Sequence, residues 1–232
     1  MRKFTRALVV GAGAVITLGL FTACSSGTKE QAPAASAAIT TAAAMPGSAT
    51  FIADMPEPGG KTMTMAIAVE GEKVVAYATN GTNDEAYFLG TQKDGRMDLM
   101  SMYGDNLKAS FEGGKVDGEI TMNETNVRPV KFSASSVAAP AGMYTATHNN
   151  ARTTFIVRPN HTIVGVMDNS APGDHKVTDA VMARQQEFKD GVRQMRLDRQ
   201  LQQAPQVNMD TMDVDMGGTM VQATRVTGNA SF

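Results

Sequence analysis

The stretch KTMTMAIAVEG, residues 61–71, alternates larger apolar residues with small or polar ones. One set of alternate positions holds Met63, Met65, Ile67 and Val69, and the other holds Thr62, Thr64, Ala66 and Ala68. Successive side chains on a β-strand point to opposite faces, so a period of two predicts a strand with one face turned toward a core. We therefore expect a half-buried strand here, with the methionine face inside.

The same alternation recurs on both sides of this strand, from about residue 49 to residue 167. Gly, Asn and Asp residues interrupt the runs at short intervals, and these residues supply the positive φ angles that tight hairpin turns require. The pattern predicts an antiparallel meander of about ten or eleven strands, mainly β, over residues 49–168. So many strands hide their open edges by closing into a small barrel or by pairing as a sandwich. Both arrangements fit the sequence.

A different pattern follows the break NSAPG at residues 169–173. Thr178 is a suitable N-cap and Ala204-Pro205 a suitable stop, which predicts a helix over about 178–203. The segment VNMDTMDVDMGGTMVQATRV that follows has Gly217-Gly218 between two alternating runs. This predicts a terminal hairpin that could extend the main sheet. Residues 169–232 are thus expected to form one helix and one hairpin.

The expected helix carries basic residues on its polar face, mixed with Glu and Asp. A solvated mixed-charge face is the favoured interpretation. The alternative is a basic contact for an anionic lipid or polymer, made by Arg193, Arg196 and Arg199. The chain as a whole has 21 Lys+Arg against 23 Asp+Glu. Because binding to a phosphate backbone depends on clustered cations, nucleic acid is not expected as a partner.

The first residues have the layout of a signal peptide. MRKFTR carries three cations, an uncharged apolar run spans residues 7–21, and the small residues Thr22 and Ala23 stand before Cys24. The apolar run is shorter than the roughly 20 residues that a membrane-spanning helix needs. Residues 1–23 are therefore expected to be removed. The mature chain would then keep 18 cations and 23 acids and carry a net charge near −5.

Phe21-Thr22-Ala23-Cys24 resembles the lipobox of bacterial lipoproteins, although the commonest form has Leu where this chain has Phe21. The resemblance implies that the Cys24 sulfur receives a diacylglycerol carrying palmitate-type chains. Two acyl chains anchor a protein stably, whereas one does so only marginally. Cys24 is the only cysteine, so a disulfide within the chain is excluded. Residues 25–48, rich in Ala, Ser, Thr and Pro, are expected to be a disordered tether to the membrane.

A second resemblance concerns FSASSVAAPAGMYTATHNNARTTFIVRPNHTIVGVM, residues 132–167. This segment resembles exported proteins of high-GC actinobacteria, in which a short A-G-x-Y strand precedes an apolar strand and a proline-containing turn. It implies an exported β domain from an actinobacterial source, and these relatives suggest no chemistry.

No complete catalytic or metal-binding pattern is present in the sequence. The histidines, His148, His161 and His175, occur in turn-like contexts without a nucleophile motif. Asp210, Asp213 and Asp215 do not fit a calcium loop, because Thr224 stands where a Glu is required. We therefore expect no catalytic residue, no metal and no cofactor.

Methionine is frequent, with 17 residues, and Met209, Met212, Met216 and Met220 lie close together in the sequence. Thioethers are soft ligands that select Cu(I), but methionine also fills hydrophobic cores. Met63, Met65, Met100 and Met102 fall at strand spacing, so core packing is the favoured interpretation, and no tight Cu(I) site is expected.

The sequence thus predicts a non-enzymatic cell-envelope lipoprotein, lipid-anchored on the extracytoplasmic face of the membrane. Its β domain is expected to bind an envelope protein or an anionic polymer. Three alternatives stay open: an envelope hydrolase, an assembly factor for envelope proteins and a methionine-rich copper-binding protein.

Overall fold

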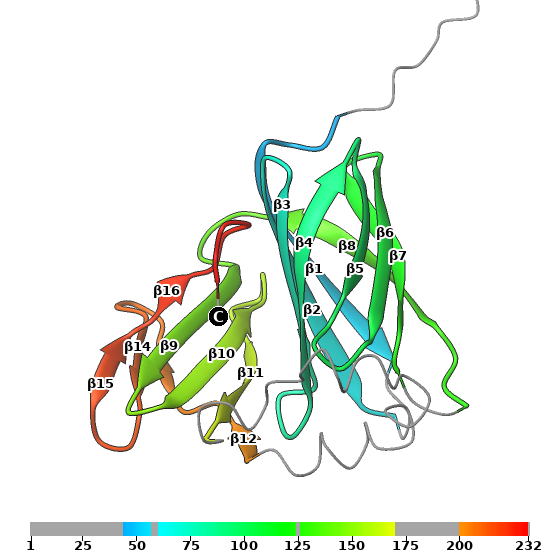
Figure 1. The fold of residues 1–232 in the computed structure, drawn as a ribbon. Coiled ribbons are helices and arrows are strands. Elements are labelled where there is room, and N and C mark those ends of the chain that lie inside the picture. Colours follow the sequence, from blue (N-terminus) through cyan, green and yellow to red (C-terminus); the bar gives the residue numbers. More distant parts are fainter. Residues whose placement is uncertain (1–43, 57–59, 124–125, 170–199, 232) are drawn as a thin grey trace, which may run out of the picture. The chain divides into compact units, whose positions relative to one another are not determined.

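A computed structural model describes residues 44–56, 60–123, 126–169 and 200–231 (Figure 1). The regular structure within these residues consists of β-strands arranged in a closed barrel, a five-stranded sheet and a three-stranded sheet. The prediction of a mainly β, antiparallel protein is confirmed, and between barrel and sandwich the structure contains the barrel.

Eight consecutive strands form the barrel, each paired antiparallel with the next, and the last strand pairs with the first. Closure leaves no unpaired edge between the first and the last strand, which is how a meander of this length avoids open edges. The strands are β1 (Ser48–Pro56), β2 (Thr62–Glu70), β3 (Lys73–Thr79), β4 (Glu85–Lys93), β5 (Arg96–Met100), β6 (Asn106–Glu112), β7 (Lys115–Thr121) and β8 (Val130–Val137).

Apolar side chains from all eight strands form the core of the barrel. The methionine face of β2 lies in this core, as the alternation predicts. Packing is close enough to require glycine at Gly118, where an added Cβ would lie 2.8 Å from Cζ of Phe132 and 2.4 Å from the backbone oxygen of Lys108. The interior is therefore occupied by the protein's own side chains.

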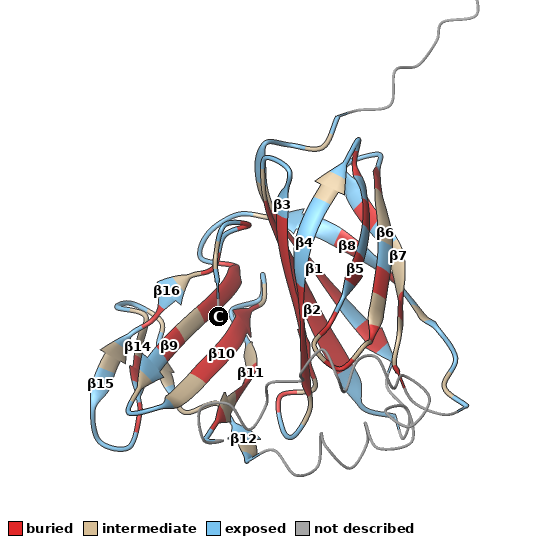
Figure 2. Ribbon diagram, in the orientation of Figure 1, coloured by how far each residue is buried: buried red, intermediate tan, exposed pale blue. Residues whose placement is uncertain are grey.

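The opposite face of β2 is also buried, which corrects the expectation of a half-buried strand (Figure 2). Ala66 and Ala68 belong to a second apolar cluster, together with Met143 and Ile156 of the neighbouring sheet. We call this contact region, between the outer side of β1–β4 and the second sheet, the barrel–sheet interface. Small residues on the outer face of β2 let the sheet approach closely.

The second sheet has the strand order β12-β11-β10-β9-β16. Its strands are β9 (Gly142–His148), β10 (Ala151–Val157), β11 (Ile163–Asp168), β12 (Leu201–Gln203) and β16 (Thr224–Arg225). The eleven strands up to Asp168 are thus divided between the barrel and this sheet, whereas the sequence suggested one meander.

Most of the helix expected over 178–203 lies outside the described residues, but its last three residues correct the prediction. Leu201–Gln203 form strand β12 and pair antiparallel with Val166–Asp168 of β11. Pairing with a neighbouring strand outweighs the helical preference of this short sequence, as tertiary context commonly does.

The third sheet consists of β13 (Val207–Asn208), β14 (Asp213–Asp215) and β15 (Met220–Gln222). The predicted terminal hairpin is present as β14 and β15, with Gly217 and Gly218 at φ 73° and 90° in its turn. It belongs to this separate sheet and not to the main sheet. Its Val214 and Val221 pack with Phe155 and Tyr144 on the face of the second sheet opposite to Ile156.

Candidate functional site

The residues for which the sequence predicted a role, Cys24, Arg193, Arg196 and Arg199, lie outside the described part of the chain. The described part of the chain contains no helix that is long and apolar enough to cross a membrane. The candidate binding sites in the described residues are therefore different ones, and they lie mainly where the barrel meets the second sheet.

An ionic cluster lies at the barrel–sheet interface. Glu85 of β4 and Asp168 of β11 are only 1 % and 4 % exposed, and both face the guanidinium of Arg152. Nη2 of Arg152 is 3.3 Å from Oε1 of Glu85 and 3.8 Å from Oδ2 of Asp168. Buried carboxylates are stable only when charges and hydrogen bonds compensate their desolvation, so Arg152 is a central element of this interface.

Two tyrosines of the barrel extend this cluster. The Arg152 guanidinium lies over the ring of Tyr87, 4.7 Å from its centroid, and Tyr87 packs against Tyr77. Burial raises the pKa of Tyr77 well above 10.0, and the charge of Glu85 raises it further. The phenol therefore stays neutral at physiological pH, and its hydroxyl is available as a hydrogen-bond donor across the interface.

A cleft of about 470 Å³ opens beside this interface, which we call the interface cleft. The β3–β4 turn forms one wall with Asn80, Gly81 and Thr82, and β11 forms another with residues 163–165. Residues 203–207 complete the described lining. Gly81 is close to β11, since an added Cβ would be 2.6 Å from Cγ2 of Val164.

The described residues that line the interface cleft are all uncharged. Its polar side chains among the described residues are the amides and hydroxyl of Asn80, Thr82, Gln203 and Gln206, and its apolar side chains include Ile163, Val164, Pro205 and Val207. Asn80 is also fixed in place, because its Oδ1 accepts backbone N–H groups of the turn at residues 82–84. Such a surface offers hydrogen bonds and apolar contact to an uncharged ligand.

Comparisons with known proteins give no family assignment. No protein-family model, curated protein or solved structure matches this chain.

A second, shallower groove of about 560 Å³ lies on the outer face of β5–β8. Three of its lining residues, Lys108, Glu119 and Lys131, stand in register on neighbouring strands, and Asp98 continues this row on β5, so the charges alternate in sign. The Lys108–Asp98 pair is 3.7 Å apart, and both side chains are more than half exposed. Opposite charges on adjacent strands compensate one another, so this row is a solvated face without net charge.

The candidate catalytic and cation-binding residues of the sequence are not brought together within the described ranges. The ring Nε2 of His148 contacts the amide of Asn149, and His161 is exposed in a separate turn; His175 lies outside these ranges. Asp210, Asp213 and Asp215 do not join a group of three His, Cys, Asp or Glu residues suited to a metal, and no such group occurs in the described part of the chain.

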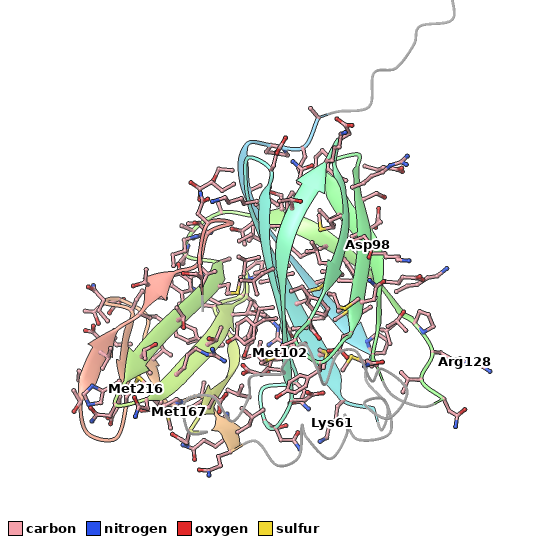
Figure 3. All side chains as sticks on the ribbon, in the orientation of Figure 1. Lys61, Asp98, Met102, Arg128, Met167 and Met216 are labelled. Carbon is pink, nitrogen blue, oxygen red and sulfur yellow. The ribbon has the colours of Figure 1, made fainter. Side chains whose placement is uncertain are left out.

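Met55, Met63, Met65 and Met97 fill the barrel core, which confirms core packing for Met63 and Met65. Met100 of β5 is 50 % exposed and Met102 is only partly buried, so the same expectation is wrong for Met100 and is not met by Met102. Met216 belongs to the apolar cluster between the second and third sheets, and Met167, Met209 and Met212 pack against that cluster. Figure 3 labels Met167 and Met216. The sequence revealed only the clustering of Met209, Met212 and Met216, because Met167 joins them through the fold.

Sequence reasoning missed the ionic cluster and the interface cleft. Glu85 and Arg152 are 67 positions apart, and nothing local distinguishes them from other charged residues near turns. The apolar and small residues surrounding Tyr77 in VVAYAT were the available signal, since a tyrosine buried in such a strand needs a partner for its hydroxyl.

Proposed function

We propose that this protein is a cell-envelope lipoprotein, anchored through Cys24, whose β domain binds a partner without transforming it. The order of cations, apolar run, small residues and cysteine at the start of the sequence supports the anchor. A diacylglycerol on Cys24 would supply two acyl chains, which suffice for stable attachment. The segment from residue 25 to 48 would then hold the β domain away from the bilayer.

The interface cleft is the observation that carries the binding role. Its described polar side chains are amides and a hydroxyl, which donate and accept hydrogen bonds but do not exchange protons near neutral pH. General acid–base catalysis requires a group that does exchange protons there. The cleft therefore favours recognition of an uncharged, hydrogen-bonding ligand over catalysis at this place.

A contact through Arg193, Arg196 and Arg199 is the second part of the proposal, and it rests on the sequence alone. Three arginines lie within seven residues of a chain that is acidic overall. Their positive charge would attract an anionic partner in the envelope.

Membrane fractionation with detergent partitioning tests the anchor. The parent protein should partition with the membrane, and Cys24→Ala should appear in the soluble fraction because no thioether-linked lipid can form. A Cys24→Ala variant that stays with the membrane like the parent would contradict the anchor while leaving the binding role open.

Site-specific photo-crosslinking in the native envelope tests the binding surface. A benzophenone amino acid placed at Thr82 or at Gln206 should give adducts, since both side chains line the interface cleft. The same group at Lys131, on the outer face of β8, is the matched control and should give none. Equal adducts at all three positions, or adducts at Lys131 only, would remove the cleft from the proposal.

The triple variant Arg193→Gln, Arg196→Gln, Arg199→Gln separates the two surfaces. Weaker capture at an unchanged melting temperature would assign part of the binding to these cations, because exposed charges contribute little to stability. Unchanged capture would mean that these cations do not contribute to binding, and the interface cleft would remain as the proposed binding surface. Turnover of a hydrolase substrate by the parent protein would overturn the non-enzymatic proposal.

A further inference from the structure

The segment that forms the third sheet has an unusual composition for a surface hairpin. Residues 207–223 contain four methionines and three aspartates, and no lysine or arginine. Asp210 and Asp215 are exposed, so the segment presents negative charge to solvent. A local excess of negative charge raises the concentration of cations at a surface.

Three of these four methionines share an apolar cluster with a fourth methionine from another strand, Met167. Met216, which follows β14, is buried in the apolar cluster between the second and third sheets, and Met209 and Met212 pack against that cluster. Met167 of β11 packs against the same cluster from the second sheet (Figure 3). We call these four residues the methionine cluster. Met220 of β15 does not belong to it and is 59 % exposed.

Three members of the methionine cluster, Met167, Met209 and Met212, are only partly buried, and Met216 is buried. Met45 and Met122 pack against the barrel core with similar partial burial, so exposure alone does not set the cluster apart. Met212 also has a φ of 59°, in the left-handed region that long side chains rarely adopt. Core filling does not account for this backbone conformation, because a left-handed backbone at a non-glycine residue opposes folding.

An independent observation points to the same layer. The Thr153 side chain is fully buried, and its Oγ1 has no hydrogen-bond partner in the described structure. Thr153 stands directly opposite Met167 and Ala146 in the ladder of the second sheet, and so faces the same side as the methionine cluster. A buried hydroxyl without a partner is unfavourable, so this layer is not an optimal purely apolar core.

We propose that the methionine cluster binds one Cu(I) ion through thioether sulfurs of Met167, Met209, Met212 and Met216. Thioethers are soft, uncharged ligands, and they select Cu(I) over the hard divalent cations that carboxylates prefer. The aspartates beside the cluster attract the cation, and the sulfurs hold it. The site is a binding site without a redox step, and it stands on observations separate from those for the interface cleft.

Competition with the Cu(I) complex of bicinchoninate tests the proposal. The protein is the full chain carrying Cys24→Ser, under anaerobic reducing conditions, so that the single thiol cannot contribute. It should withdraw one Cu(I) per chain from the coloured probe. The triple variant Met209→Leu, Met212→Leu, Met216→Leu in the same background should bind at least ten-fold more weakly. Leucine conserves side-chain volume closely, so the fold is expected to persist.

Met220→Leu is the matched control, because it removes an exposed thioether from the same segment and lies outside the methionine cluster. Its affinity should equal that of the parent. Met209→Leu alone provides a second test with little effect on packing, since Met209 is only partly buried, and it should weaken binding several-fold. Failure of the parent to compete with bicinchoninate would overturn the site, as would an unchanged affinity in the triple variant or equal losses in Met220→Leu and the triple variant.

Discussion

The hydroxyl of Tyr77 donates a hydrogen bond to the backbone carbonyl oxygen of Thr154, 3.1 Å away, and so joins strand β3 of the barrel to strand β10 of the second sheet. Both residues are buried, and 77 positions of sequence separate them. The bond is one of several polar contacts across the barrel–sheet interface, and it makes the stability of this interface measurable by single substitutions.

Tyr77→Phe should lower the free energy of unfolding by about 1 kcal/mol, because it keeps the ring and removes the donor to the Thr154 carbonyl. Urea denaturation of the parent and the variant measures this difference. An unchanged midpoint at the same slope would show that the Thr154 carbonyl finds another donor.

The same phenol predicts a loss of stability at alkaline pH. Burial, followed by the charge of Glu85, raises the pKa of Tyr77 in the folded protein above its ordinary value of 10.0. Above that pH the unfolded chain releases the phenolic proton while the folded chain retains it, so the free energy of unfolding falls as pH rises. Below about pH 10 the phenol of Tyr77 is protonated in both states, so it makes no contribution to the pH dependence of the free energy of unfolding.

Denaturation at about pH 8 and about pH 11 checks this prediction. The loss between the two conditions should be smaller in Tyr77→Phe than in the parent, because phenylalanine has no proton to lose. Equal alkaline losses in the parent and Tyr77→Phe would contradict the raised pKa.

Arg152→Met should be among the more damaging single substitutions, with a loss of about 3–5 kcal/mol. It removes the guanidinium that faces two buried carboxylates, those of Glu85 and Asp168. The matched control is Arg158→Met, whose partner Asp54 is 51 % exposed, and a pair of that kind contributes about 1 kcal/mol or less. Thermal and urea unfolding of both variants compares them, and similar losses would show that burial of the acids does not set the cost.

Gly228→Ala should destabilise the protein by about 1–3 kcal/mol, because the added methyl group has no space. A Cβ at Gly228 would lie 2.4 Å from the backbone nitrogen of Glu70 and 2.4 Å from the backbone oxygen of Lys73, both next to the β2–β3 turn. Gly47→Ala is the control, since nothing lies within 4 Å of its added Cβ. Hydrogen exchange at the β2–β3 turn should rise in Gly228→Ala only; equal exchange in both variants would argue against this contact.

The strands of the barrel could be predicted because their signal is local. The alternation of Met63 and Met65 with threonines gives both the strand and its inner face, and glycine-containing turns give the hairpins. Burial of Ala66 and Ala68 could not be predicted, since alanine is compatible with a solvent face as well as with close packing. The choice between a closed barrel and a sandwich could not be predicted either, because the pairing of β8 with β1 joins residues far apart in the sequence, such as Phe51 and Ser136.

The candidate sites were less predictable than the fold for the same reason. The interface cleft combines the β3–β4 turn with residues 203–207, and the methionine cluster needs Met167 beside a segment that begins some 40 residues later. Local patterns identified Met209, Met212 and Met216 as a group, but only the paired strands place Thr153 opposite Met167. Strand Leu201–Gln203 was mistaken for the end of a helix because its partner, β11, is also remote.

The small outer residues of β2 and β3 have a consequence for the order of folding. Barrel strands pair with their neighbours in sequence, so most of their contacts are local, whereas Arg225 reaches Thr50 across 175 positions. Contacts between sequence neighbours generally form faster than contacts across long stretches of chain. If the barrel forms first, Ala66, Ala68 and Val75 would be exposed to solvent as an apolar strip until the second sheet covers them. Until then, this strip would be accessible to chaperones and to other unfolded chains.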